Sequence, residues 1–193
     1  MKYFLKELAL IKHDDIREQT IKVLERVNEQ FFEAAASSTG KYHPQYALGK
    51  GGLYRHTRAA VGIAACLFQL DMFQYFTPRG EDYIIAALIL HDVCKSGTNW
   101  EGKYTKHEHP ILAADLVREV LGAEGEPDCE FIECVCPLIE SHMGQWNSCK
   151  WSRITLPIPV QDREKFVHAC DYLASRKFLE YVFDDEEEED EDD

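Results

Sequence analysis

The chain has 193 residues, 45% of them hydrophobic, which suffices for one globular domain and leaves little room for a second. Ten consecutive acids at 184–193 account for most of the net charge of −14, because the other residues carry 25 acids against 21 basic residues. This mild acidity argues against binding to long nucleic acid, and no apolar stretch approaches the ~20 residues that span a bilayer.

The spacing of apolar residues predicts helices along almost the whole chain. The expected helices cover 14–36, 53–70, 81–94, 110–122, 128–142 and 162–182. Prolines and glycines separate them, most densely in the irregular segment 41–52, and Pro137 is expected to kink the fifth helix. No alternation of polar and apolar residues is sustained, so the predicted fold class is all-α.

We expect three parts along the chain. An N-terminal helical segment at 1–50 packs on a helical core at 51–183, and the acids at 184–193 form a disordered, solvated tail. Such a tail promotes solubility or binds a basic partner, and the sequence leaves both roles open.

The N-terminal residues and the cysteines favour a cytoplasmic location without membrane association. Charges are scattered among the first apolar residues, which is unlike a signal peptide. The seven cysteines are odd in number, and Cys134 and Cys136 are too close for a disulfide framework. Because no Cys-x-x-Cys pair occurs, a cysteine zinc site is poorly supported.

Histidines and aspartates recur near the expected helix ends, where side chains from several helices can converge. They are His56, the adjacent pair His91 and Asp92, His109, His142 and Asp171. Imidazole nitrogens and carboxylate oxygens suit divalent ions such as Mn, Fe, Ni, Co, Zn or Mg. The apolar run 86–90 would bury the helix before the adjacent pair and so fix its ligands. The sequence predicts a metal site without identifying the ion.

Four short segments resemble one known family. The order His, His-Asp, Asp resembles the signature of HD-domain metal-dependent phosphohydrolases, and the local sequences are similar to the HD domain of YhaM-type 3′-5′ exoribonucleases. The segments are GGLYRHT at 51–57, LHDVCK at 90–95, IESHMG at 139–144 and HACDYL at 168–173. With a helix upstream, the similarity covers 14–178. The OB-type domain of those exoribonucleases has no room in this chain, and their pattern lacks the acidic tail, which weakens the case for long RNA.

The resemblance implies a role for each member of the His and Asp set. The implied ligands of one ion are His56, His91, Asp92 and Asp171. His109 and His142 match positions that bind a second ion in two-metal HD proteins and contact the phosphate in one-metal relatives, so one or two divalent ions are expected. His107 competes with His109, which is favoured because it starts a helix as in the family.

Further residues are expected to act on the substrate. Asp92 orients the attacking water, and Lys95 binds the phosphate or, alternatively, serves as a helix C-terminal cation. Arg176 grips a second phosphate or is a solvated surface charge. Trp146 stacks on a base or packs ordinarily. Similar candidates for stacking are Trp100 and Tyr104.

The expected function is hydrolysis of a phosphodiester or phosphoanhydride bond in a nucleotide or short oligonucleotide. A 3′-5′ exonuclease is the version that the resemblance implies, and a small-molecule nucleotidase or cyclic-nucleotide phosphodiesterase is the version that the acidic charge favours. The alternative of another class is a non-catalytic HD module that binds a nucleotide or a protein.

Overall fold

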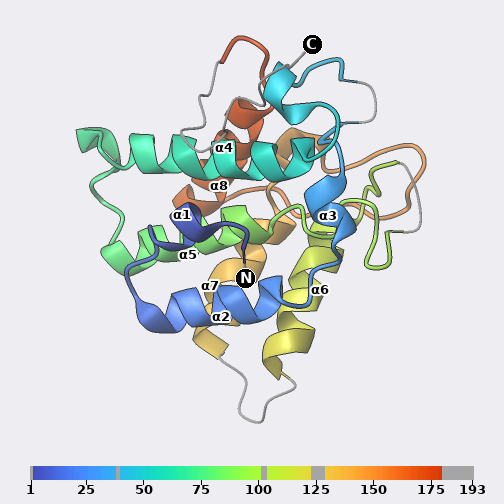
Figure 1. The fold of residues 1–193 in the computed structure, drawn as a ribbon. Coiled ribbons are helices and arrows are strands. Elements are labelled where there is room, and N and C mark those ends of the chain that lie inside the picture. The colour runs from blue at the N-terminus through green and yellow to red at the C-terminus, as the bar shows by residue number, and fades with distance from the viewer. Residues whose placement is uncertain (1, 38–39, 101–103, 123–128, 180–193) are drawn as a thin grey trace, which may run out of the picture.

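The computed structural model describes residues 2–37, 40–100, 104–122 and 129–179. These residues form helices and no strands, which confirms the all-α fold class (Figure 1). The α-helices are α1 (Leu5–Leu8), α2 (Asp14–Leu24), α3 (Gln30–Glu33), α4 (Gly52–Leu67), α5 (Pro78–Leu90), α6 (His109–Gly122), α7 (Cys129–Glu140) and α8 (Asp162–Ala174). Short 3₁₀ helices lie at Gln45–Ala47, Asp71–Phe73 and Gly144–Trp146.

The prediction of one helix at 14–36 is wrong, because α2 ends at Leu24 and α3 is a separate turn. Asn28 lies in the break, and its side-chain oxygen accepts a hydrogen bond from the Gln30 backbone N–H at 3.0 Å. Side-chain bonding of this kind competes with a continuous helix. The sequence did not predict α1, whose four residues are too few to show a helical period.

Helices α5 and α8 differ from the predicted ranges 81–94 and 162–182. α5 begins at Pro78, where Thr77 caps it by accepting the Gly80 N–H at 3.1 Å. It ends at Leu90, so that His91 and Asp92 lie just beyond the helix. α8 ends at Ala174, and the Ser175 hydroxyl then donates to the Tyr172 carbonyl at 2.7 Å. The other expected helices correspond to α4, α6 and α7.

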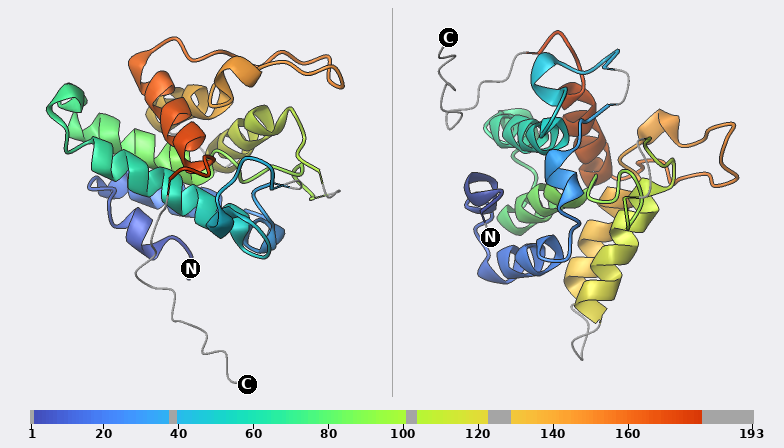
Figure 2. Two further views of the ribbon diagram at one scale, coloured as in Figure 1. Left: turned by 90° about the horizontal axis from the view of Figure 1, so that it is seen from above. Right: turned by 45° about the vertical axis from the view of Figure 1, so that its right-hand side comes forward.

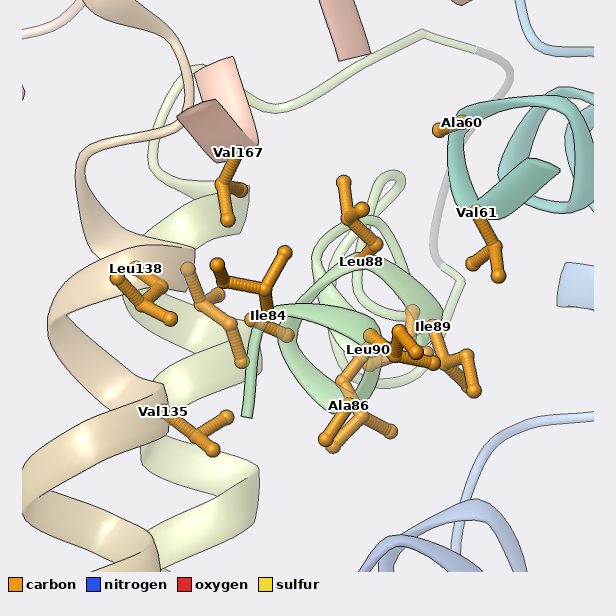
Figure 3. Close-up of a cluster of buried hydrophobic side chains, with 14 of the residues drawn as sticks. Ala60, Val61, Ile84, Ala86, Leu88, Ile89, Leu90, Val135, Leu138 and Val167 are labelled. Carbon is orange, nitrogen blue, oxygen red and sulfur yellow. The ribbon is translucent and has the colours of Figure 1, made fainter. Parts of the chain in front are cut away.

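The core is built around α5, which lies between α4 and α2 and also contacts α7 and α8 (Figure 1). A helix that is apolar on all sides is stable only when buried, and every residue of α5 from 82 to 90 is buried. Figure 3 shows the side chains of α5 among those of α4, α7 and α8. The labelled contacts of this region include Ile84, Leu88, Val135, Leu138 and Val167.

An aromatic cluster, made of Tyr3, Phe4, Phe31, Phe32 and Tyr54, holds the N-terminal residues against α4. The rings of Tyr3 and Phe32 stack with centroids 3.8 Å apart, and those of Phe4 and Tyr54 meet edge to face at 4.8 Å. Phe4 and Phe31 are fully buried. Aromatic contacts of this geometry add to the area that they bury, so the cluster ties the start of the chain to the core.

The boundaries of the predicted parts at 1–50 and 51–183 stay predictions, and the acidic tail at 184–193 lies outside the described residues. Within the described ranges, no helix combines the length and the apolar character needed to cross a membrane.

Candidate metal centre

Five helices bring the predicted ligands together. His56 lies on α4, His91 and Asp92 directly follow α5, His109 begins α6, His142 follows α7, and Asp171 lies on α8. We call these six residues the His/Asp cluster. The views of Figure 2 show α4 and α8 side by side, in agreement with their contacts. The two helices bring His56 Nε2 to 2.9 Å from Asp171 Oδ1. Five of the six residues are at most 1% exposed, and the Asp171 side chain is 19% exposed.

Asp92 stands at the middle of the cluster. Its Oδ1 lies 3.0 Å from His109 Nε2 and 3.9 Å from His142 Nε2. Its Oδ2 lies 3.4 Å from His91 Nε2 and 3.9 Å from His56 Nε2. One carboxylate therefore faces four imidazole rings, two on each oxygen, and could bridge two ions.

Asp171, on α8, lies beside two of the imidazole rings that Asp92 also faces. Its Oδ1 lies 2.9 Å from His56 Nε2 and 3.5 Å from His91 Nε2. The cluster contains three overlapping groups of residues, and within each group the potential ligand atoms lie within 4.8 Å of one another. They are His56, His91 and Asp92; His91, His142 and Asp171; and Asp92, His109 and His142.

Three of the rings are oriented by hydrogen bonds to their own local backbone. The Nδ1 of His91, His109 and His142 lies 2.6, 2.7 and 2.7 Å from the carbonyl oxygen three residues earlier. A carbonyl only accepts, so each Nδ1 carries the proton and donates it. In the neutral form of each ring the lone pair is then on Nε2, which points into the cluster in all three rings, as in metal-binding histidines.

The electrostatics of the cluster are those of a cation site. Burial alone would raise the pKa values of both carboxyl groups. Lys95 and His91 outweigh the effect of burial at Asp92, and His56 and His91 outweigh it at Asp171. Both pKa values therefore lie well below the usual range. Burial would lower the pKa of His91, but the two carboxylates raise it to about 10. Two buried negative charges thus draw positive charge to themselves.

The unpaired atoms fit a divalent ion. His91 Nε2 and Asp92 Oδ1 are buried and form no well-aligned hydrogen bond, although His109 Nε2 lies 3.0 Å from that oxygen. Such atoms are costly unless something else binds them. Nitrogen and carboxylate oxygen are suitable ligands for several divalent metals. The cluster could therefore hold one ion or two, with Asp92 shared between them.

The three predicted substrate residues line one pocket with the cluster. This cluster pocket has a volume of about 220 Å³, and its walls include Lys95, Trp146 and Arg176 together with His56 and Asp171. Lys95 Nζ donates a hydrogen bond to Asp92 Oδ2. The reading of Lys95 as a helix C-terminal cation loses its basis, because α5 ends five residues earlier.

Arg176 and Trp146 belong to an aromatic stack at the rim of the cluster pocket. The Arg176 guanidinium lies 4.4 Å from the Tyr172 ring centroid and 5.5 Å from that of Tyr42. Trp146 also stacks on Tyr172, with centroids 5.6 Å apart and planes 13° apart. Trp146 is 46% exposed, so an open ring face is available for a base.

Sequence reasoning assigned no role to His168, which supports the turn that carries His142. His168 Nδ1 lies 2.7 Å from the His142 carbonyl oxygen, and its Nε2 lies 3.1 Å from Gln145 Oε1. The turn passes so close that a Cβ on Gly144 would lie 2.3 Å from the His168 ring, and Gly144 has a φ of +56°. The glycine two residues after His142 was the available signal for this close approach.

The other candidates, His107 and Tyr104, are not among the residues that line the cluster pocket, whereas His43 is. His107 Nε2 donates a hydrogen bond to the Asn147 carbonyl oxygen at 3.2 Å. His43 lines the cluster pocket 5.6 Å from the His56 ring, and burial, helped by His56, lowers its pKa to about 3. Tyr104 is 72% exposed.

Comparison with known proteins gives one match. The sequence pattern of the family described as "HD domain" matches residues 53–176, which is well over half of the chain. The matched range contains every member of the His/Asp cluster. Neither the curated proteins nor the solved structures contain a significant match. The closer resemblance to YhaM-type exoribonucleases stays a prediction.

Proposed function

The chain belongs to the HD domain family, a superfamily of metal-dependent phosphohydrolases, and from that premise we propose that it hydrolyses phosphodiester or phosphoanhydride bonds in nucleotides or short oligonucleotides. The observation that carries the proposal is the buried His/Asp cluster, with its unpaired nitrogen and oxygen atoms beside a pocket.

The cluster offers two overlapping ligand sets. One ion would be held by His56, His91, Asp92 and Asp171. A second would be held by Asp92, His109 and His142. A bound divalent ion would polarise a phosphate and lower the pKa of bound water from its bulk value toward neutrality.

The chain's own residues would then position the reactants. Lys95 is a cation beside Asp92 and can neutralise the phosphate charge that develops during attack. Asp92 accepts hydrogen bonds and can orient the water in line with the bond that breaks. Arg176 can hold a further phosphate, and Trp146 presents an exposed ring to a base.

Two versions of the activity differ in their products. A 3′-5′ exonuclease shortens an oligonucleotide one residue at a time, whereas a nucleotidase or cyclic-nucleotide phosphodiesterase acts on monomers only. An oligonucleotide ladder incubated beside a panel of mononucleotides separates these versions, because only the exonuclease produces a stepwise series of shorter products.

The test of the proposal is a metal add-back screen. The protein is stripped of metal and supplied with Mn, Ni, Co, Mg or Zn, and hydrolysis is measured on bis-p-nitrophenyl phosphate, short RNA and DNA, and nucleotides. We expect turnover that depends on added metal and disappears in Asp92→Ala. Absence of turnover with every metal, despite stoichiometric metal binding, would contradict the proposal and favour a non-catalytic binding module.

A further inference from the structure

A second, larger pocket adjoins the cluster pocket. This side pocket has a volume of about 690 Å³, which lies within the range of pockets that bind small molecules. Ser37, Lys95 and Thr105 line both pockets, so the two hollows meet at these residues. A ligand with its phosphate beside Lys95 therefore has room for a second group on the far side of that lysine.

The walls of the side pocket come largely from a segment that precedes the HD match. They include Gln30, Ala35, Gly40 and Gly49, all before residue 53. Small side chains keep this space open: a Cβ added at Gly49 would meet no atom within 4 Å. The N-terminal part of the chain thus adds a compartment to the centre that the family residues build.

The side pocket suits an uncharged group. Among the described residues that line it, Glu33 and Lys95 are charged. Glu33 is paired with Lys50 at 2.8 Å, and Lys95 is bonded to Asp92 at the junction of the two pockets. The cluster pocket, by contrast, carries Arg176 and the histidines. A phosphate is therefore better accommodated in the cluster pocket, and a neutral polar group in the side pocket.

Trp100 gives the side pocket an unused hydrogen-bond donor. It is 9% exposed and lines the pocket, and its indole Nε1–H is buried without an acceptor. Its backbone has a φ of +52°, which is a strained conformation for a bulky residue. Strain of this kind is retained chiefly at functional positions, and the free N–H is suited to a carbonyl acceptor on a ligand.

We propose that the side pocket binds the nucleoside of a substrate whose phosphate lies at the His/Asp cluster. The proposal rests on the proposed function and narrows it to substrates in which a single nucleoside adjoins the phosphate that is attacked. Ser37, Thr105 and Gln30 supply neutral hydrogen-bonding groups for the sugar and base, and Trp100 contributes an apolar face and the free donor. Specificity for the nucleoside would then come from residues that precede the matched domain as well as from Trp100.

The test compares two p-nitrophenyl phosphate diesters that differ only in the second group, which is methyl in one and thymidine 5′-yl in the other. In each, water forms a new P–O bond and p-nitrophenolate leaves. We expect the wild-type protein to prefer the thymidine ester in kcat/KM. Ala35→Phe fills the pocket and should lower kcat/KM for the thymidine ester by ~10-fold or more, while leaving that for the methyl ester within about twofold.

Two further variants sharpen this test. Trp100→Phe keeps an aromatic ring but removes the N–H, and should lower kcat/KM for the thymidine ester by about fivefold. Ala9→Phe is the matched control, because it makes the same change at an exposed position outside both pockets. Ala9→Phe should leave kcat/KM unchanged for both esters. Circular dichroism establishes whether each variant is folded. If Ala35→Phe does not fold, Trp100→Phe tests the proposal in its place.

A binding measurement separates failure of this proposal from failure of the hydrolase proposal. The metal-loaded protein is titrated calorimetrically with the methylene phosphonate analogue of thymidine 5′-monophosphate and with a phosphorothioate-linked thymidine trinucleotide. Binding that weakens in Ala35→Phe and not in Ala9→Phe supports the side pocket, and the tighter ligand shows whether it takes a free nucleotide or a strand end. Equal binding by the unmodified protein, Ala35→Phe and Ala9→Phe, or hydrolysis of both esters without preference, overturns the side-pocket proposal. Absence of turnover alone contradicts only the hydrolase.

Discussion

The His/Asp cluster and the aromatic cluster are both buried, and both join segments that are distant in sequence. The aromatic rings satisfy one another: Tyr3 stacks on Phe32, and Phe4 packs on Tyr54. The His/Asp cluster leaves His91 Nε2 and Asp92 Oδ1 without hydrogen-bond partners and holds two carboxylates at low pKa. The aromatic cluster is complete through packing alone. The His/Asp cluster needs positive charge to balance its carboxylates, and the chain supplies that charge only through protonated imidazole and Lys95. The contrast separates burial for stability from burial for a ligand.

The largest effect on activity and metal binding is expected from Asp92→Ala. Because Asp92 contacts all four imidazoles of the cluster, its loss should lower kcat/KM by about 10³-fold and remove the rise in Tm that added metal produces. Hydrolysis assays and thermal unfolding with and without metal measure both effects. A variant that kept its activity and its metal-dependent Tm would show that the cluster is a structural polar core.

The opposite result is expected in the aromatic cluster. Phe31 is fully buried there, and Phe31→Ala should lower the free energy of unfolding by about 3–5 kcal/mol through lost contacts and the cavity left behind. Denaturant titration measures this loss. The variant should still gain stability from added metal as the unmodified protein does, because Phe31 is not among the residues that supply potential ligand atoms. Loss of that gain would mean that the two regions are coupled.

A smaller effect is expected at His168, which acts through the turn carrying His142. His168→Ala should weaken metal affinity by ~10-fold, in the lower part of the range for residues that orient a ligand. His168→Gln keeps a hydrogen-bonding side chain and should recover part of that affinity. Competition with a coloured chelator measures the change. Unaltered affinity in His168→Ala would show that the turn holds His142 without this contact.

The smallest effect is expected where charges are paired on the surface. Arg79 donates hydrogen bonds to Asp15 and Glu130, which lowers the pKa values of both carboxyls. Since the folded pKa values lie below the ordinary ones, these pairs stabilise the fold above pH of about 4 and lose that contribution as the pH falls further. Arg79→Gln should flatten this part of the stability–pH curve slightly, as urea unfolding at several pH values would measure. A large change would show that surface charge matters as much as the buried clusters.

Local sequence predicted more of the cluster than of its surroundings. The apolar run before His91 and Asp92 predicted the buried helix α5. The motif segments contain five of the six cluster residues, and His109 was identified by its place at the start of a helix. Their roles as ligands stay predictions until metal binding is measured. The capping of α5 by Thr77 and the break at Asn28 were missed because single side-chain hydrogen bonds decide them.

Contacts between distant segments were beyond the reach of spacing arguments. Tyr42 meets Arg176 only because the segment before α4 folds over the end of α8. The side pocket arises in the same way, since residues near 30–49 and Trp100 become neighbours only in the folded chain. No periodicity within either segment carries that information, because tertiary packing creates it.

The hydrogen bonds from three ring Nδ1 atoms to carbonyls three residues earlier have an evolutionary consequence. Each ring takes its orientation from a stretch of four residues, so inheritance of that stretch carries the orientation with it. Apart from supports such as His168, distant mutations can then accumulate without turning the rings. The residues before α4 that wall the side pocket take no part in these three bonds, so a substitution among them can reshape the pocket while the rings keep their orientation.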